Sequence, residues 1–172
     1  MTHGRSPLQC AVPLHSDFDH AAFEPKTRRV FIAHTARDCI EVIDHDAKRH
    51  IATLPGFPGV AGAVADDGDI LTTNRGAATI TWLDAATYEV KGVFPSGRQP
   101  NGAAIVKHLG LGIAACIGDA DQGPVLQTIN LKVWPSLLSQ STSLRVMPSA
   151  SAQHRPRLLC RLSNQGFSGE LA

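Results

Sequence analysis

A repeat of about 40 residues is the feature that most constrains what this sequence can fold into. The unit at Val30–Leu54 returns downstream with its landmarks in the same order. The segment Val42-Ile43-Asp44 comes back as Trp82-Leu83-Asp84, and Thr53-Leu54-Pro55 comes back as Val93-Phe94-Pro95. Because two separate landmarks share one spacing, the sequence predicts a repeat protein.

A period of this length fits either a pair of helices or the four short strands of a propeller blade. Each unit divides into short runs of apolar and β-branched residues, and turn signals such as Asp66-Asp67-Gly68-Asp69 separate these runs. Ile40–Ile43 and Thr79–Leu83 alternate in the manner of strands, whereas apolar residues at helical spacing are absent. We therefore expect an all-β fold, a β-propeller built of four-stranded antiparallel blades.

The repeats divide the chain into three parts. In the N-terminal segment 1–17, residues 8–13 form a possible closing strand, because propellers pair a strand from one terminus with the blade at the other. Residues 18–130 hold the blades, and 131–172 are expected to be an irregular, disordered tail. A closed propeller has about four to eight blades. The expected propeller is therefore incomplete, with two whole blades and the first three strands of a third, at 18–56, 58–96 and 100–130.

The charge of the chain changes at the same boundary as the repeat. The net charge is +1, but residues 131–172 carry five Lys or Arg side chains against a single acid, Glu170. The loss of acids and of repeat landmarks at one point is also what a frameshifted or truncated reading frame would produce. The sequence leaves both explanations of the tail open.

Composition argues against several classes of protein. A net charge of +1 and a pI of about 7.8 give no general attraction to nucleic acid or to anionic membranes. The N-terminus has no apolar run of signal-peptide or membrane-helix length, so a cytoplasmic location is expected for the chain as written. The four cysteines lie far apart without a Cys-x-x-Cys pair, and the histidines lack zinc-site spacing. These spacings suggest neither a zinc site nor a redox motif, and the sequence leaves the metal unknown; we expect reduced, partly buried thiols and mostly surface histidines.

Five short segments resemble the YVTN-type β-propeller repeat, which is related to the NHL and lactonase-like propellers. The likeness rests on order and spacing over about residues 8–130, in Phe18–Pro25, Arg29–His34, Ile40–Asp44, Leu71–Asn74 and Pro100–Ile105. This resemblance implies a ring of blades around a central channel. Family members are often periplasmic or on the cell surface, which differs from the location expected from the N-terminus.

An aspartate or asparagine ends the third strand of each unit, at Asp44, Asp84 and Asn130. Such side chains bond to the backbone two residues further on and hold a turn. We assign these three residues a structural role in turns.

Polar residues recur where the loops of a propeller gather at the mouth of its channel. Asp19-His20 and Asn101-Gly102 are equivalent in the repeat, and His34, Asn74 and Cys116 are equivalent to one another. A polar small molecule, or a divalent cation such as Ca²⁺ held by oxygen ligands, could bind there. The alternative is that these side chains only cap turns at the surface. The candidate ligand-binding residues are Asp19, His20, His34, Asn74, Asn101 and Asp119.

The sequence favours a non-enzymatic binding or scaffold protein with a protein or a polar small molecule as its partner. No nucleophile elbow, phosphate-binding loop or catalytic residue is identified, and neither nucleic acid nor a membrane is expected as a partner. Copies of the chain could also associate with one another to cover open blade faces.

Two alternatives to this function remain open. The first is a metal-dependent hydrolase of the lactonase or esterase type, in which the resemblance to lactonase-like propellers gives Asn74, Asn101 and Asp119 a part in holding the metal. The second is a truncated or frameshifted product without a stable function.

Overall fold

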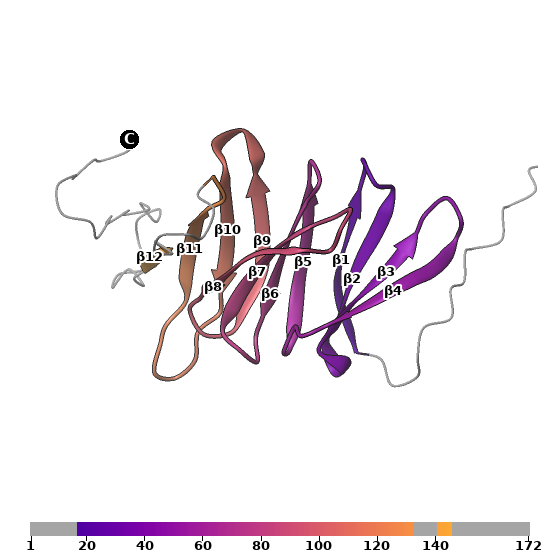
Figure 1. Ribbon diagram of the computed structural model, residues 1–172. Helices are drawn as coiled ribbons and strands as arrows, with labels where there is room; N and C mark the ends of the chain where they lie inside the picture. Colours follow the sequence, from indigo (N-terminus) through magenta and orange to yellow (C-terminus); the bar gives the residue numbers. More distant parts are fainter. Residues whose placement is uncertain (1–16, 133–140, 146–172) are drawn as a thin grey trace, which may run out of the picture.

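The computed structural model describes residues 17–132 and 141–145 (Figure 1). This part of the chain folds into three four-stranded antiparallel sheets in which consecutive strands are neighbours. Sheet A contains β1 (Phe18–Glu24), β2 (Arg29–His34), β3 (Cys39–Asp44) and β4 (Arg49–Pro55). Sheet B contains β5 (Val60–Asp66), β6 (Asp69–Asn74), β7 (Thr79–Asp84) and β8 (Val90–Pro95). Sheet C contains β9 (Pro100–Val106), β10 (Leu111–Cys116), β11 (Val125–Asn130) and β12 (Ser141–Arg145).

Helix is confined to two short 3-10 segments in the described residues, Thr35–Arg37 and Lys107–Leu109. Neither segment approaches the length and hydrophobicity that a helix needs to cross a membrane.

The expectation of an all-β chain with four-stranded antiparallel sheets is confirmed. Sheets A and B span residues 18–55 and 60–95, which agrees closely with the predicted units at 18–56 and 58–96. The sequence predicts three strands for the third unit, whereas sheet C has a fourth, β12, paired with β11. The sequence of β12 has one apolar residue in five and therefore shows no strand alternation. The possible closing strand at 8–13 lies outside the described residues.

The three sheets lie in a row, with the first strand of each beside the first strand of the next (Figure 1). Strand β5 contacts both β1 and β9, β2 also contacts β5, and β6 contacts β9. Sheet B therefore has a neighbouring sheet on each side.

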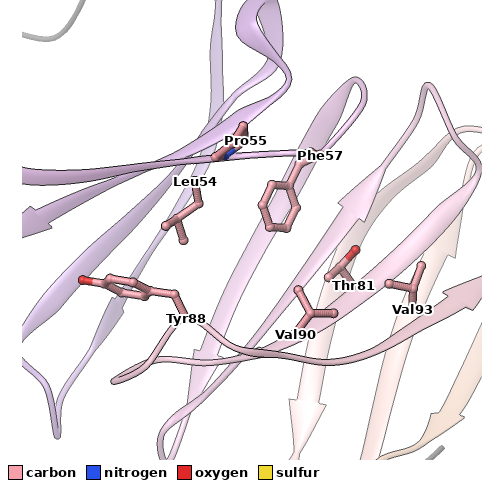
Figure 2. A pocket seen from close by; sticks show the side chains of 8 residues that line it. Leu54, Pro55, Phe57, Thr81, Tyr88, Val90 and Val93 are labelled. Atoms are coloured by element: carbon pink, nitrogen blue, oxygen red, sulfur yellow. The ribbon is translucent and has the colours of Figure 1, made fainter.

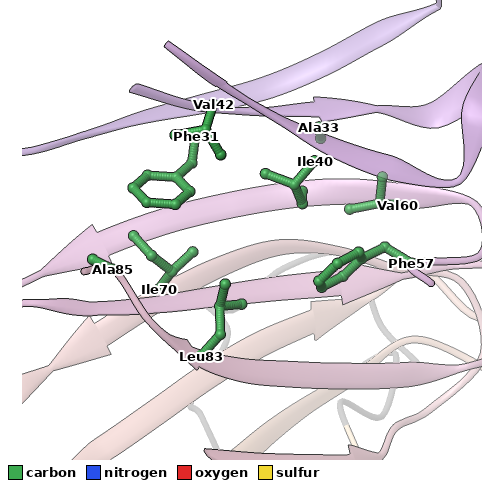
Figure 3. Packing of buried hydrophobic residues seen from close by; sticks show 9 residues of the cluster. All are labelled: Phe31, Ala33, Ile40, Val42, Phe57, Val60, Ile70, Leu83 and Ala85. Atoms are coloured by element: carbon green, nitrogen blue, oxygen red, sulfur yellow. The ribbon is translucent and has the colours of Figure 1, made fainter. Parts of the chain in front are cut away.

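Apolar side chains from sheets A and B meet in one buried cluster (Figure 3). Those from β2 and from β3 are alternate residues, because every second side chain of a strand points to the same face. Burying a side chain of this size contributes roughly 1.5–3 kcal/mol to folding, so the cluster is the main force that holds sheet A against sheet B. Its members are Phe31, Ala33, Ile40, Val42, Phe57, Val60, Ile70, Leu83 and Ala85.

The opposite face of sheet B packs against sheet C in a second cluster. The neighbouring residues Ile70 and Leu71 belong to different clusters, since they point to opposite faces of β6. Every residue of β6 is accordingly buried. The second cluster comprises Leu71, Ile80, Trp82, Phe94, Ala114, Ile129 and Leu131.

Charged groups also join the sheets, at the end where the β5–β6 turn lies. Asp69 accepts a hydrogen bond from Lys91 at 2.8 Å and another from Lys107, which follows β9 of sheet C. Burial raises the pKa of Asp69, but the hydrogen bonds from Lys107 and Lys91 outweigh this effect and lower the pKa below its usual value. Glu24 of sheet A accepts a hydrogen bond from the backbone N–H of Gly68 in the same turn, at 3.1 Å.

The substitution Asp69→Asn is expected to lower the free energy of unfolding at neutral pH by about 1.5–3 kcal/mol, the usual value of hydrogen bonds to a charged group. Because the pKa of Asp69 is lowered in the folded state, its stabilisation is present above the ordinary value of 3.8 and is lost as the pH falls through the folded value. The free energies of unfolding of the wild type and the variant, measured with urea, should therefore become equal in acid. Parallel stability curves from neutral to acidic pH would contradict this account.

Candidate functional site

The linkers between the sheets, residues 56–59 and 96–99, lie at the same end of the strands in all three sheets. We call this end the linker end. Strand β1 is antiparallel to β2 and pairs Phe18 with His34, so the start of β1 lies at this end together with the end of β2. The same pairing in sheets B and C places the starts of β5 and β9 there. The linker end is therefore where side chains from three first strands can meet.

Arg75 connects the three sheets at the linker end. It directly follows β6 of sheet B, and its Nη2 atom donates to Asp19 Oδ2 of β1 at 3.0 Å and to Asn101 Oδ1 of β9 at 2.6 Å. Its side chain is 34% exposed, so the guanidinium is reached by solvent. We call Asp19, Arg75, Asn101 and the adjacent His20 the linker-end cluster.

His20 extends this cluster towards solvent. Its Nδ1 atom lies 2.7 Å from Asp19 Oδ1 and 3.2 Å from the backbone oxygen of Ala61 on β5. The side chain is 51% exposed. An imidazole, a carboxylate, a guanidinium and an amide are thus gathered within one patch of surface.

A close approach of β5 and β9 next to the linker-end cluster fixes the backbone of Asn101. Thr73 Oγ1 donates to the backbone oxygen of Asn101 at 2.6 Å and accepts from the backbone N–H of Gly62 at 2.8 Å. A Cβ atom at Gly62 would lie 2.3 Å from the Asn101 oxygen and 2.6 Å from Thr73 Oγ1. Only glycine allows the two strands to come this close at their ends.

The linker-end cluster can recognise a polar molecule by several hydrogen bonds at once. Arg75 and His20 supply donors, and Asp19 and Asn101 supply acceptors. The Arg75 Nε atom is buried and has no hydrogen-bond partner within residues 17–132.

The structure places other candidate residues at the linker end but gives them different contacts. The Asn74 amide is buried between strands, where its Nδ2 atom donates to Thr79 Oγ1 at 3.1 Å and to Thr81 Oγ1 at 2.9 Å. Asp119 lies in the loop after β10, pairs with Arg98 at 3.1 Å and accepts the backbone N–H of Gln122. Neither side chain belongs to the linker-end cluster.

His34 is buried on the face of sheet A that points away from sheet B. Its Nδ1 atom lies 2.9 Å from Glu41 Oε1, and Cys39 Sγ lies 3.6 Å from the same oxygen. The other oxygen of Glu41 is contacted by His50 Nε2 at 2.7 Å and Thr53 Oγ1 at 2.5 Å. We call these five residues the Glu41 cluster.

Hydrogen bonding controls ionisation in the Glu41 cluster. Burial raises the pKa of Glu41, but hydrogen bonds from Thr53, His34, His50 and Cys39 outweigh it and lower the pKa to about 2. Burial and the neighbouring Glu41 raise the pKa of the Cys39 thiol to about 11. At neutral pH the cluster therefore holds one carboxylate and a protonated thiol.

The three residues assigned to turns lie at the opposite end of the sheets. Asp44 Oδ1 accepts from the backbone N–H of Asp46 at 2.9 Å, and Asp84 Oδ1 accepts from that of Ala86 at 2.8 Å. Asn130 Oδ1 accepts from the backbone N–H of Lys132 at 2.9 Å. In each case the bonded N–H belongs to the residue two positions further on, as in an Asx turn.

An apolar hollow of about 260 Å³ lies between sheets A and B (Figure 2). Its only polar side-chain groups are the hydroxyls of Thr81 and Tyr88. Ligand sites of proteins are commonly larger and carry several convergent polar groups, so the linker-end cluster is the better candidate for recognition. The hollow is lined by Leu54, Pro55, Gly56, Phe57, Thr81, Tyr88, Val90 and Val93.

Sequence reasoning missed the residues that organise both clusters. Arg75 could have been predicted, because it directly follows Asn74, which was already placed at the mouth of the expected channel. Glu41 was concealed, since it stands in an alternating strand where a charged residue normally faces solvent.

Comparison with known proteins gives a fold and no family. No family model matches the chain, and no curated protein matches it. Among solved structures, the chain is similar to Kuenenia stuttgartiensis hydrazine synthase, with a TM-score of 0.61 and 14% sequence identity. The match covers 76% of this chain and 35% of that one, so the chain spans about a third of the length of the solved protein. At this identity the likeness concerns the fold alone.

The substitution Gly62→Ala is expected to lower the free energy of unfolding by about 1–3 kcal/mol, because the added methyl group would overlap the backbone oxygen of Asn101. Gly102→Ala, in the next first strand, is the matched control, since a Cβ atom there meets nothing within 4 Å. Chemical denaturation of both variants measures the difference. Equal stability of the two variants would show that the close approach of β5 and β9 is not required.

Proposed function

We propose that the three sheets are consecutive blades of a YVTN-like β-propeller and that the chain binds a polar small molecule or peptide at the linker end. The order and spacing of the repeat landmarks support the propeller. The neighbouring positions of β1, β5 and β9 agree with it, because first strands lie side by side around the axis of such a ring.

The contact of Arg75 with both Asp19 and Asn101 is the observation that carries this proposal. One guanidinium connects side chains from three sheets, so the donors and acceptors around it are held in fixed relative positions. Preorganised polar groups bind a ligand without the entropy cost of ordering them first. The role proposed is recognition without chemistry.

The alternative of a metal-dependent hydrolase gains no support from the contacts of the described residues. The Arg75 guanidinium lies between the oxygens of Asp19 and Asn101, where its positive charge opposes a divalent cation. Asn74 and Asp119, implied in metal binding by the resemblance, make their hydrogen bonds elsewhere.

Ligand binding is tested by thermal-shift screening of the purified chain against short peptides and polar metabolites, including dicarboxylates. A molecule that raises the melting temperature should bind at least about tenfold more weakly to Arg75→Gln, because at least one charge-assisted hydrogen bond is lost. The matched control is Arg98→Gln, which removes an exposed arginine paired with Asp119 at the same end. Binding that is weakened equally by both substitutions, or an absence of any binding molecule, would contradict the proposal.

Association of several copies is a second expectation of an incomplete ring. Sheets A and C each have one face that no other sheet of the described residues covers. Light scattering of the purified chain should therefore give a discrete dimer or trimer, because copies would bury these faces against each other. A monodisperse monomer over a wide range of concentration would contradict self-association.

A further inference from the structure

The Glu41 cluster brings together residue types that bind transition metals. His34, Cys39 and Glu41 each offer one ligand atom, and these atoms all lie within 4.8 Å of one another. All three residues are buried. A mixed set of imidazole, thiolate and carboxylate ligands suits Zn²⁺, whereas Ca²⁺ and Mg²⁺ prefer oxygen alone.

The backbone fixes these residues before any metal binds. His34 ends β2 and is paired across the ladder with Cys39, the first residue of β3. Glu41 lies two residues further along β3, on the same face of the sheet. Sites built on paired strands are more rigid than sites built on loops.

Two of the three distances between ligand atoms in the cluster are comparable with those of a zinc site, and all three atoms lie within 4.8 Å of one another. Ligand atoms around Zn²⁺ lie roughly 3.3–3.6 Å apart, as follows from bond lengths of about 2.0–2.3 Å. In the structure, Glu41 Oε1 lies 2.9 Å from His34 Nδ1 and 3.6 Å from Cys39 Sγ. Binding of the ion would replace the direct contact between His34 Nδ1 and Glu41 Oε1.

The second carboxylate oxygen of Glu41 is held from sheet A as well. His50 Nε2 and Thr53 Oγ1 contact it at 2.7 Å and 2.5 Å. Partners of this kind orient a ligand and are commonly worth about 10- to 100-fold in metal affinity. His50 is 28% exposed, so it is the member of this pair through which the cluster meets solvent.

The repeat itself shows that the fold does not require this chemistry. The positions of His34, Cys39 and Glu41 correspond in sheet B to Asn74, Thr79 and Thr81, a neutral hydrogen-bonded group. In sheet C they correspond to Cys116, Val125 and Gln127, and Gln127 bonds to the backbone of the linker. Sheet A alone has metal-binding residue types at all three positions.

We propose that the Glu41 cluster binds one Zn²⁺ ion through His34, Cys39 and Glu41, with His50 and Thr53 positioning the carboxylate. Binding releases the thiol proton of Cys39, since the thiolate is the ligand. One thiolate and one carboxylate then balance the two charges of the ion. The buried site is electrically neutral, which limits the cost of removing the charges from water.

The test uses the full chain after treatment with a chelator, titrated with Co²⁺ as a spectroscopic substitute for Zn²⁺. One Co²⁺ per chain is expected, with a thiolate-to-metal absorption band in the near ultraviolet that Zn²⁺ displaces. Cys39→Ser should abolish this band, whereas Cys116→Ser should retain it, because Cys116 is a buried thiol at a position without metal-binding neighbours.

A second variant keeps the test decisive if Cys39→Ser disturbs folding. His50→Asn changes a partly exposed residue and should weaken Zn²⁺ binding by about tenfold or more in calorimetry. His108→Asn, at an exposed histidine far from the cluster, should bind as the wild type does. A chain that binds no metal, a cobalt band that survives Cys39→Ser, or equal affinity of the two histidine variants would overturn the proposal.

Discussion

Burial of both faces of sheet B is the constraint on which the rest of the structure depends. A single four-stranded sheet cannot cover its own apolar faces, and side chains that alternate along β6 need a neighbour on each side. Sheets A and C supply these neighbours. The first strands are brought together as a result, and the linker-end cluster exists because three sheets are packed in this order.

The fold class was predictable because repeat spacing and strand alternation are properties of the sequence itself. Asp44 and Asp84 mark equivalent strand ends, and both occupy equivalent turns in the structure. Strand β12 was not predictable, since pairing with β11 uses backbone hydrogen bonds that almost any sequence can make. A strand with one apolar residue leaves no periodic signal to detect.

The candidate sites were predictable only in part, because side-chain partners depend on packing between sheets. Asp19 and Asn101 were recognised from their places in the repeat, but the residue that joins them, Arg75, comes from a third position. The Glu41 cluster escaped motif analysis for a related reason. Its members come from three strands, so their spacing in sequence matches no known metal-binding pattern.

The two clusters show how equivalent positions of a repeat can acquire different roles. Asn74 and Thr81 use their polar atoms inside sheet B, where a neighbouring sheet covers them. Glu41 occupies the same position as Thr81 but lies on the face of sheet A turned away from sheet B. The side chains on this face are buried without contact with sheet B, and they form a cluster of ionisable groups in place of the neutral hydrogen-bonded group of sheet B.

In the part of the chain that the structure describes, sheet B contacts sheets A and C, its neighbours in sequence, and this arrangement affects how such a chain can evolve. A unit of about 40 residues can be gained or lost by duplication or deletion without changing the interfaces between the units that remain. Residues such as Arg75, which contact both neighbouring sheets, would then preserve the order of units. The length of such a chain can therefore vary in whole units.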